Sequence, residues 1–262
     1  MQQAHQQFVD AAPGVRLWTE QRGPADAPPL LLVMGAQAAG LGWPEPFVDA
    51  LAVQHRVIRY DHRDTGRSTW SFDEQPYRIT DLAQDIVRVL DGLGIERAHL
   101  VGLSLGGMLT QIVLADHPDR VLSATLMGTS AMSTTPYTRP DGTEVPVDEL
   151  PGIAPEVLEM WSRPVEDHGL EAELDRRVEH WRVLSGGQLP FDPAHYRDLE
   201  RRIIEHTGRY DVSTAPPPAH PPPPRPTRRL PPPRTTPPPP PPAAPTHTPP
   251  HPSPHRPPRP PP

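Results

Sequence analysis

Residues 97–107 read Arg-Ala-His-Leu-Val-Gly-Leu-Ser-Leu-Gly-Gly, and this stretch decides the fold. A short apolar run leads into Ser104, which has a glycine two residues before it and another two residues after it, and a helix-like pattern follows. The pattern predicts a strand, a sharp turn and a helix that present a nucleophilic serine. Gly102 and Gly106 are expected because a Cβ atom would collide where strand and helix approach closely. We predict that the Leu105 N–H points at a developing oxyanion.

Strand and helix signals alternate before the serine, as they do in a parallel sheet with crossover helices. One helix is predicted over residues 79–93 with Thr80 as its N-cap, and a second over 106–116. Residues 133–208 read as helical throughout, and they predict a cap over the pocket. The candidate strands are 15–20, 30–34, 56–60, 98–103 and 120–127, and the candidate cap helices are 155–161, 170–184 and 194–207.

The last 50 residues differ from the rest of the chain, because they contain 27 of its 43 prolines and no acidic residue. Such a segment buries too little apolar surface to offset its ordering entropy, so we expect it to be disordered. The sequence therefore predicts an α/β core over 1–132, a helical cap over 133–212 and a Pro/Arg-rich tail over 213–262. Proline has no N–H for a sheet ladder, so the tail is unsuited to supplying further strands.

Composition excludes several kinds of function. The chain has a formal net charge of −7, and six tail arginines leave −13 on the first 212 residues, which makes nucleic acid a poor partner. No apolar run approaches the ~20 residues of a membrane span, and the N-terminus has no signal-peptide pattern. The chain has no cysteine and no convincing metal or dinucleotide motif. We expect no cofactor, no metal, no membrane partner and a cytoplasmic location.

The loop after the predicted strand 30–34 reads Met-Gly-Ala-Gln, and it is placed to supply a second oxyanion donor. The backbone N–H of Ala36 is therefore the expected partner of the Leu105 N–H, although Gly35 could also simply turn the chain. A serine nucleophile further needs a base and an orienting acid, which this arrangement places C-terminal to it. No convincing candidate follows, because residues 127–135 contain no Asp or Glu. The histidines considered are His117 at a helix end, His168, His180, His195 and His206 in the cap, and His220, His247, His251 and His255 among prolines.

Five stretches resemble the α/β-hydrolases, and among them the aclacinomycin methylesterase-type enzymes that cleave a methyl ester on anthracycline polyketides. They are Leu-Leu-Val-Met-Gly (31–35), Leu-Gly-Trp-Pro (41–44), Val-Ile-Arg-Tyr-Asp-His-Arg-Asp-Thr-Gly-Arg-Ser (57–68), Val-Gly-Leu-Ser-Leu-Gly (101–106) and Trp-Arg-Val-Leu-Ser-Gly (181–186). The resemblance covers about residues 8–210. Its most specific part is the block 60–68, which resembles the turn after strand four of that family. We interpret Asp61 and Arg63 there as structural, satisfying buried backbone or each other.

The resemblance implies an α/β-hydrolase fold, a small hydrophobic ester as substrate and an acyl-enzyme at Ser104. It also implies an Asp after strand seven and a His after strand eight. That region would begin near Tyr210, where the match stops. We therefore expect strands seven and eight of the family's sheet to be missing from this chain, and the triad acid and base stay unassigned. Trp43 and Trp181 are expected to pack beneath the cap.

Three functions stay open. The first is a serine hydrolase acting on a carboxylic ester, with a methyl ester as one option, and the second is a catalytically impaired remnant of such an enzyme. The third is an interaction protein working through its tail, where Pro-Pro-Pro-Arg (231–234) resembles polyproline II ligands. The chain contains no Lys or Asn, and the tail uses only residue types with C-rich codons. We therefore hypothesise that the tail arises from a shifted reading frame.

Overall fold

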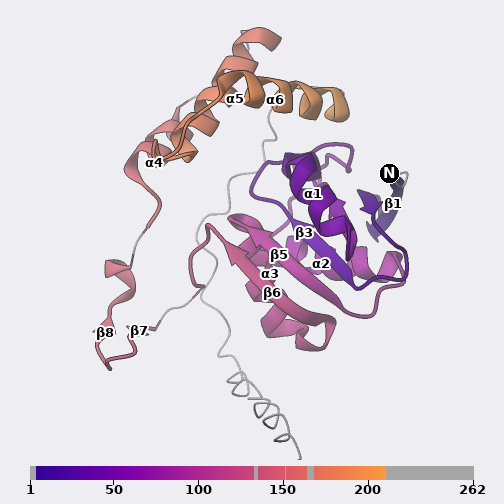
Figure 1. Ribbon diagram of the computed structural model, residues 1–262, viewed down its shortest axis with the longest axis horizontal. Coiled ribbons are helices and arrows are strands. Elements are labelled where there is room, and N and C mark those ends of the chain that lie inside the picture. Colours follow the sequence, from indigo (N-terminus) through magenta and orange to yellow (C-terminus); the bar gives the residue numbers. More distant parts are fainter. Residues whose placement is uncertain (1–3, 133–134, 151, 164–167, 211–262) are drawn as a thin grey trace, which may run out of the picture. The chain divides into compact units, whose positions relative to one another are not determined.

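The computed structural model describes residues 4–132, 135–150, 152–163 and 168–210. Within these ranges a six-stranded sheet has the order β1-β2-β4-β3-β5-β6. Figure 1 shows its strands β3, β5 and β6 side by side. Strands β3, β4, β5 and β6 are parallel, whereas β2 pairs antiparallel with both β1 and β4. The predicted parallel sheet is thus confirmed. The strands are β1 (His5–Ala12), β2 (Val15–Arg22), β3 (Pro29–Val33), β4 (Arg56–Tyr60), β5 (Ala98–Leu103) and β6 (Val121–Met127).

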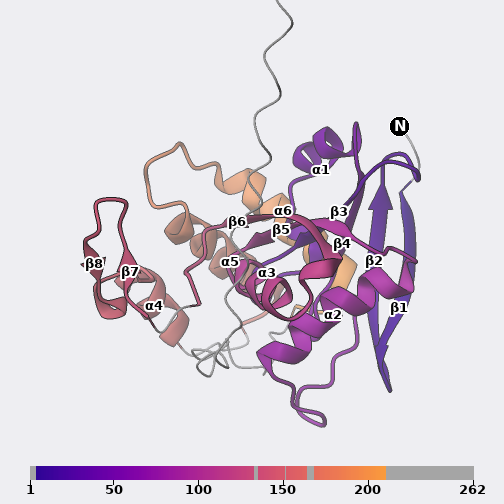
Figure 2. The ribbon, with the colours of Figure 1, turned by 90° about the horizontal axis from the view of Figure 1, so that it is seen from below.

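The central strands are apolar on both faces because helices cover both faces. In β3, Leu31 and Val33 join the apolar cluster beneath α2 (Ile79–Gly92) and α3 (Leu105–Asp116). Leu30 and Leu32 alternate with them and join the cluster of α1 (Glu45–Ala52). Figure 2 shows α2 and α3 on one side of the strands and α1 on the other. A short 3₁₀ helix, η1 (Gly40–Gly42), precedes α1, and another, η2 (Pro118–Arg120), precedes β6.

The start of α2 differs from the prediction. Its N-cap is Arg78, and the Asp81 carboxylate accepts the Arg78 backbone N–H at 2.7 Å. Thr80 lies inside the first turn, so its assignment as N-cap was wrong. Asp81 is the better cap partner because a carboxylate near the helix N-terminus also interacts favourably with the helix dipole.

Strand β6 forms the outer edge of the sheet among the residues that the structure describes. Its side chains are exposed after Val121, and Leu122, Leu126 and Met127 are 41%, 42% and 37% exposed. Such a strand offers unpaired backbone groups next to apolar side chains, which is a template for pairing with another chain.

The described residues after β6 contain three α-helices where three helices were predicted, but this segment is not helical throughout. Strands β7 (Tyr137–Thr138) and β8 (Glu144–Val145) form a small hairpin, followed by the 3₁₀ helix η3 (Val147–Glu149). A turn at Asp141 and Gly142 interrupts helix formation: Gly142 has φ +86°, and the Asp141 carboxylate accepts the Thr143 N–H. The helices are α4 (Pro155–Ser162), α5 (Leu170–Leu184) and α6 (Pro193–Thr207).

Helix α6 connects this segment to the core. Leu199 and Ile203 pack against Ala39, which follows β3. His206 lies edge-on to Trp18 and bonds through Nε2 to the Asp61 carboxylate at 2.7 Å. Within residues 4–210 as described, no helix is long and apolar enough to cross a membrane. The predicted tail lies outside the described residues.

Candidate active site

Ser104 occupies the junction between β5 and α3 with φ 54° and ψ −116°. A positive φ is costly for a residue with a Cβ and persists only where the surrounding structure enforces it. Here the Ser104 N–H donates to the Met127 carbonyl at 2.9 Å, while the Ser104 carbonyl accepts the Gly107 N–H at 2.9 Å. One residue is thereby held by both β6 and α3. The side chain is partly exposed at the carboxyl end of the parallel strands.

The two glycines around Ser104 permit a close approach of backbone to backbone. A Cβ on Gly102 would lie 2.4 Å from the Gly106 carbonyl oxygen. A Cβ on Gly106 would lie 2.1 Å from the carbonyl oxygen of Val33 in β3. Neither position can hold a side chain unless backbone moves, as expected for glycines at a close approach of strand and helix.

The loop after β3 lies next to the serine. A Cβ built on Gly35 would lie 3.5 Å from Ser104 Cβ, so a side chain at Gly35 would contact the serine. The next residue, Ala36, is partly buried against the apolar cluster beneath α2 and α3, and Gln37 has φ 56°. Leu105 opens α3, where the first N–H groups have no intrahelical acceptor and the helix dipole favours negative charge. The fold thus brings together Ser104, the Leu105 N–H and the loop that contains Ala36.

Asp61, in the turn after β4, is fully buried and bonds to backbone. Its carboxylate accepts the Gly40 N–H at 2.7 Å and the Arg67 N–H at 2.8 Å. Arg63 does not pair with Asp61, which was one of the expected options. It forms a two-pronged ion pair with Asp85 in α2, with both N–O distances at 2.7 Å.

Within the described part of the chain, no histidine hydrogen-bonds to the Ser104 hydroxyl. His117 contacts Gln84, His180 accepts from the Trp161 indole, and His206 binds Asp61. Burial lowers the pKa of His180. The candidates from His220 onward lie outside the described residues, as does the expected position of the triad acid and base.

His62 was not among the residues predicted from the sequence; it is 3% exposed and lies beside the loop that contains Ala36. Its Nε2 is 3.0 Å from the Met34 carbonyl oxygen, and its Nδ1 has no partner among the described residues. Burial lowers the pKa of His62, against the opposing effects of the Met34 bond and the Asp61 carboxylate. Its place directly after a short buried strand was the available signal, since the carboxyl ends of parallel strands meet at one sheet edge.

Trp43 and Trp181 belong to one apolar cluster on the α1 side of the sheet. Trp43 is buried, whereas Trp181 is partly buried and stacks on Tyr196. The Trp181 indole N–H donates to Glu200 at 2.6 Å, so it fixes α5 to α6. This arrangement agrees with the expected packing role.

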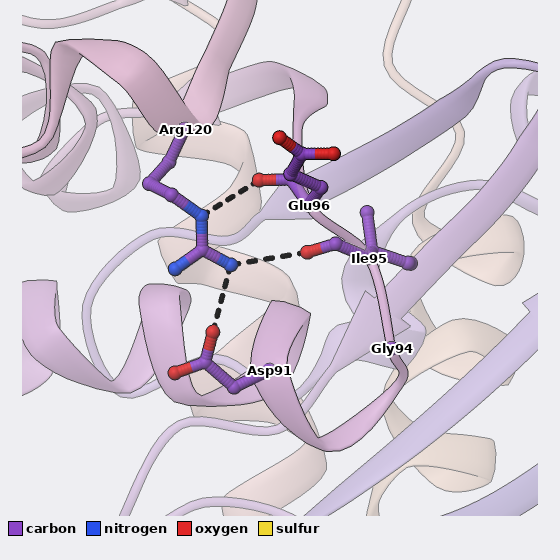
Figure 3. Close-up of a pocket in the computed structure, with 5 residues that line it drawn as sticks. All are labelled: Asp91, Gly94, Ile95, Glu96 and Arg120. Carbon is purple, nitrogen blue, oxygen red and sulfur yellow. Dashed lines mark hydrogen bonds and ion pairs between the residues drawn. The ribbon is translucent and has the colours of Figure 1, made fainter.

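A pocket of about 410 Å³ lies at the other end of the parallel strands, where α2 ends and β5 and β6 begin. In Figure 3, Arg120 points at Asp91 and at the backbone of the turn after α2. Its guanidinium donates to the carbonyls of Glu96 and Ile95 at 2.7 and 3.0 Å and pairs with Asp91 at 2.7 Å. These groups satisfy one another's hydrogen-bonding capacity. We therefore interpret the residues of this pocket as structural, holding the turn after α2 next to the start of β6. The described residues contain no cluster of three metal-ligating side chains.

The comparisons with known proteins agree with this geometry. A family model described as "alpha/beta hydrolase fold" matches residues 28–171, which include β3, β4, β5, α3 and β6. The chain belongs to the α/β-hydrolase fold family. The fold that the resemblance implied is thus confirmed.

Among relatives of this α/β hydrolase is rhodomycin D methylesterase DauP of Streptomyces sp. strain C5, which is 40% identical over 75% of this chain and 68% of its own length. Rhodomycin D methylesterase DnrP of Streptomyces peucetius is 41% identical over the same shares. A hydrolase from Pseudomonas aeruginosa PA01 has a similar structure, with a TM-score of 0.52 at 23% identity over 80% of this chain and 74% of its own. That structure supports the fold alone.

Proposed function

We propose that this α/β hydrolase cleaves a carboxylic ester through an acyl-enzyme at Ser104. The observation that carries the proposal is the strained Ser104 backbone, with φ 54°, at a strand-to-helix turn whose glycines admit no side chain. Strain of this kind persists at functional sites where the geometry is needed. The relatedness to two methylesterases favours an ester, and a methyl ester in particular, as the substrate class.

Ser104 Oγ attacks the acyl carbon, and the oxyanion that forms accepts hydrogen bonds from the Leu105 and Ala36 N–H groups. Both donors are main chain, and each typically contributes ~10²–10³ in rate. The serine proton passes to a base and then to the leaving alcohol, and water releases the acid from Ser104. The base and its orienting acid are unassigned.

The predicted cap would cover the Ser104 site from the side of α6, which contacts the core at Ala39 and Asp61. Trp181 is partly exposed there and contributes apolar surface, with the buried Trp43 in the same apolar cluster. This suits a small hydrophobic ester with no cofactor. In this proposal residues 1–132 form the α/β core, residues 133–212 the helical cap and residues 213–262 the tail.

A catalytically impaired chain is the second candidate, favoured by the lack of a histidine on the Ser104 hydroxyl within the residues described. A fluorophosphonate probe separates the two. We expect an activated Ser104 to displace fluoride and form a serine phosphonate ester, which intact-mass analysis detects as one adduct per chain. Ser104→Ala is the control. No adduct on the wild type after prolonged incubation would contradict the proposal and favour the impaired alternative.

A further inference from the structure

His62 combines three observations that the proposed reaction does not use. It is almost fully buried, its Nε2 lies 3.0 Å from the Met34 carbonyl oxygen, and its Nδ1 has no partner among the described residues. A carbonyl oxygen only accepts hydrogen bonds, so Nε2 carries the proton and Nδ1 the lone pair. The contact therefore fixes the tautomer of His62.

The carbonyl that His62 holds belongs to the peptide that joins Met34 to Gly35. A Cβ on Gly35 would lie 3.5 Å from Ser104 Cβ, so the loop passes next to the serine, and the following N–H is that of Ala36, the proposed oxyanion donor. Glycine rotates freely about its backbone bonds, so nothing in Gly35 itself fixes the direction of the next peptide. On the far side, Gln37 has φ 56°. A tether on the Met34 carbonyl is thus placed where it limits rotation of the oxyanion loop.

Packing alone does not account for a histidine at this position. A buried polar atom without a partner costs about 1–3 kcal/mol, and Nδ1 is such an atom within the described residues. An apolar side chain of similar size would fill the space without that cost. Only the imidazole supplies the hydrogen bond from Nε2–H to the Met34 carbonyl oxygen.

We propose that His62 is a positioning residue that holds the Met34–Gly35–Ala36 backbone so that the Ala36 N–H faces the oxyanion on Ser104. The inference rests on the proposed function of Ser104 and Ala36. His62 touches neither the substrate nor the reacting atoms; it acts through the loop.

The test compares His62→Phe, which keeps a ring and removes the donor, with His62→Gln, which keeps an N–H at similar reach. The fluorophosphonate labelling of the 262-residue chain is resolved into the binding constant KI and the chemical rate kinact. We expect His62→Phe to lower kinact by about 10-fold or more with KI little changed, as a misdirected oxyanion donor would. His62→Gln should recover most of kinact. Equal kinact in all three proteins, or no recovery in His62→Gln, would overturn the proposal.

A second measurement does not depend on labelling, and it separates failure of this inference from failure of the proposed function. Nitrogen-15 NMR of the wild-type chain should find His62 as the Nε2–H tautomer, and amide hydrogen exchange at Gly35 and Ala36 should accelerate in His62→Phe but not in His62→Gln. An Nδ1–H tautomer, or unchanged exchange in His62→Phe, would overturn the positioning role even if Ser104 labels normally. Absent labelling with the expected tautomer and exchange would overturn the proposed function of Ser104, and with it the catalytic purpose of the tether.

Discussion

Replacing Gly106 by Ala tests whether the close approach of α3 to β3 creates the site. The new Cβ would lie 2.1 Å from the Val33 carbonyl oxygen and 2.7 Å from that of Met34. Both obstacles are backbone, so the start of α3 must retreat from β3 by roughly 1 Å, and overpacking of this kind costs about 1–3 kcal/mol. Alanine returns about 1 kcal/mol through its better helix propensity. We expect a net loss of up to about 2 kcal/mol in the free energy of unfolding.

The same displacement moves the Leu105 N–H, and a shift of about 1 Å in a catalytic group can cost ~10²-fold in rate. Urea unfolding measures the stability, and the rate of fluorophosphonate labelling measures the site. Gly152→Ala is the matched control, because its Cβ meets nothing within 4 Å and its φ is not positive. The reasoning is refuted if Gly106→Ala labels as fast as Gly152→Ala and is equally stable.

Three further predictions follow from buried charge and from the sheet edge. Burial lowers the pKa of His62 from its ordinary 6.5, so the native state binds fewer protons than the unfolded state, and the free energy of unfolding should fall as pH drops below about 6.5. Urea unfolding from pH 8 to 5 should show a shallower decline in His62→Gln than in the wild type. An equal decline would contradict the lowered pKa of His62. Arg63→Met should cost about 3–5 kcal/mol in urea unfolding because it leaves Asp85, 1% exposed, without its partner; a loss under about 1 kcal/mol would mean that the pair contributes little. Leu126→Lys should reduce self-association in light scattering, because a charge on an exposed edge strand opposes strand pairing; Val53→Lys, at a site 73% exposed outside the sheet, is the control and should leave it unchanged.

Local patterns predicted those elements whose burial is continuous or clearly periodic. Strands β4 and β5 begin and end where predicted, because each is a short buried run between turn residues. Helix α5 also has the predicted bounds. Strand β1 was missed because Val9 is its one fully buried residue, so the pattern that marks a strand is weak. Helix α1 was missed because it begins among prolines, with Pro44 as its N-cap.

The residues of the site also differ in whether local sequence could reveal them. Ser104 and the glycines around it follow from eleven consecutive residues, so the sequence alone was enough to single them out. The contact of His62 with Met34 joins residues 28 positions apart, and it exists because β3 and β4 pair in parallel with Leu31 beside Ile58. No local pattern contains that register. Asp85 likewise could not be recognised as the partner of Arg63, because the pair forms only when α2 packs next to the turn after β4.

The most direct test of the account is to find where an acyl group attaches to the chain. Wild-type protein, Ser104→Ala and Gly106→Ala are mixed with an activated ester, quenched in acid, digested and sequenced by tandem mass spectrometry. We predict an acyl adduct on Ser104 in the wild type, none in Ser104→Ala and a strongly reduced amount in Gly106→Ala. An adduct at another residue, or equal acylation of the wild type and Ser104→Ala, would contradict the central claim that the turn between β5 and α3 presents a nucleophile.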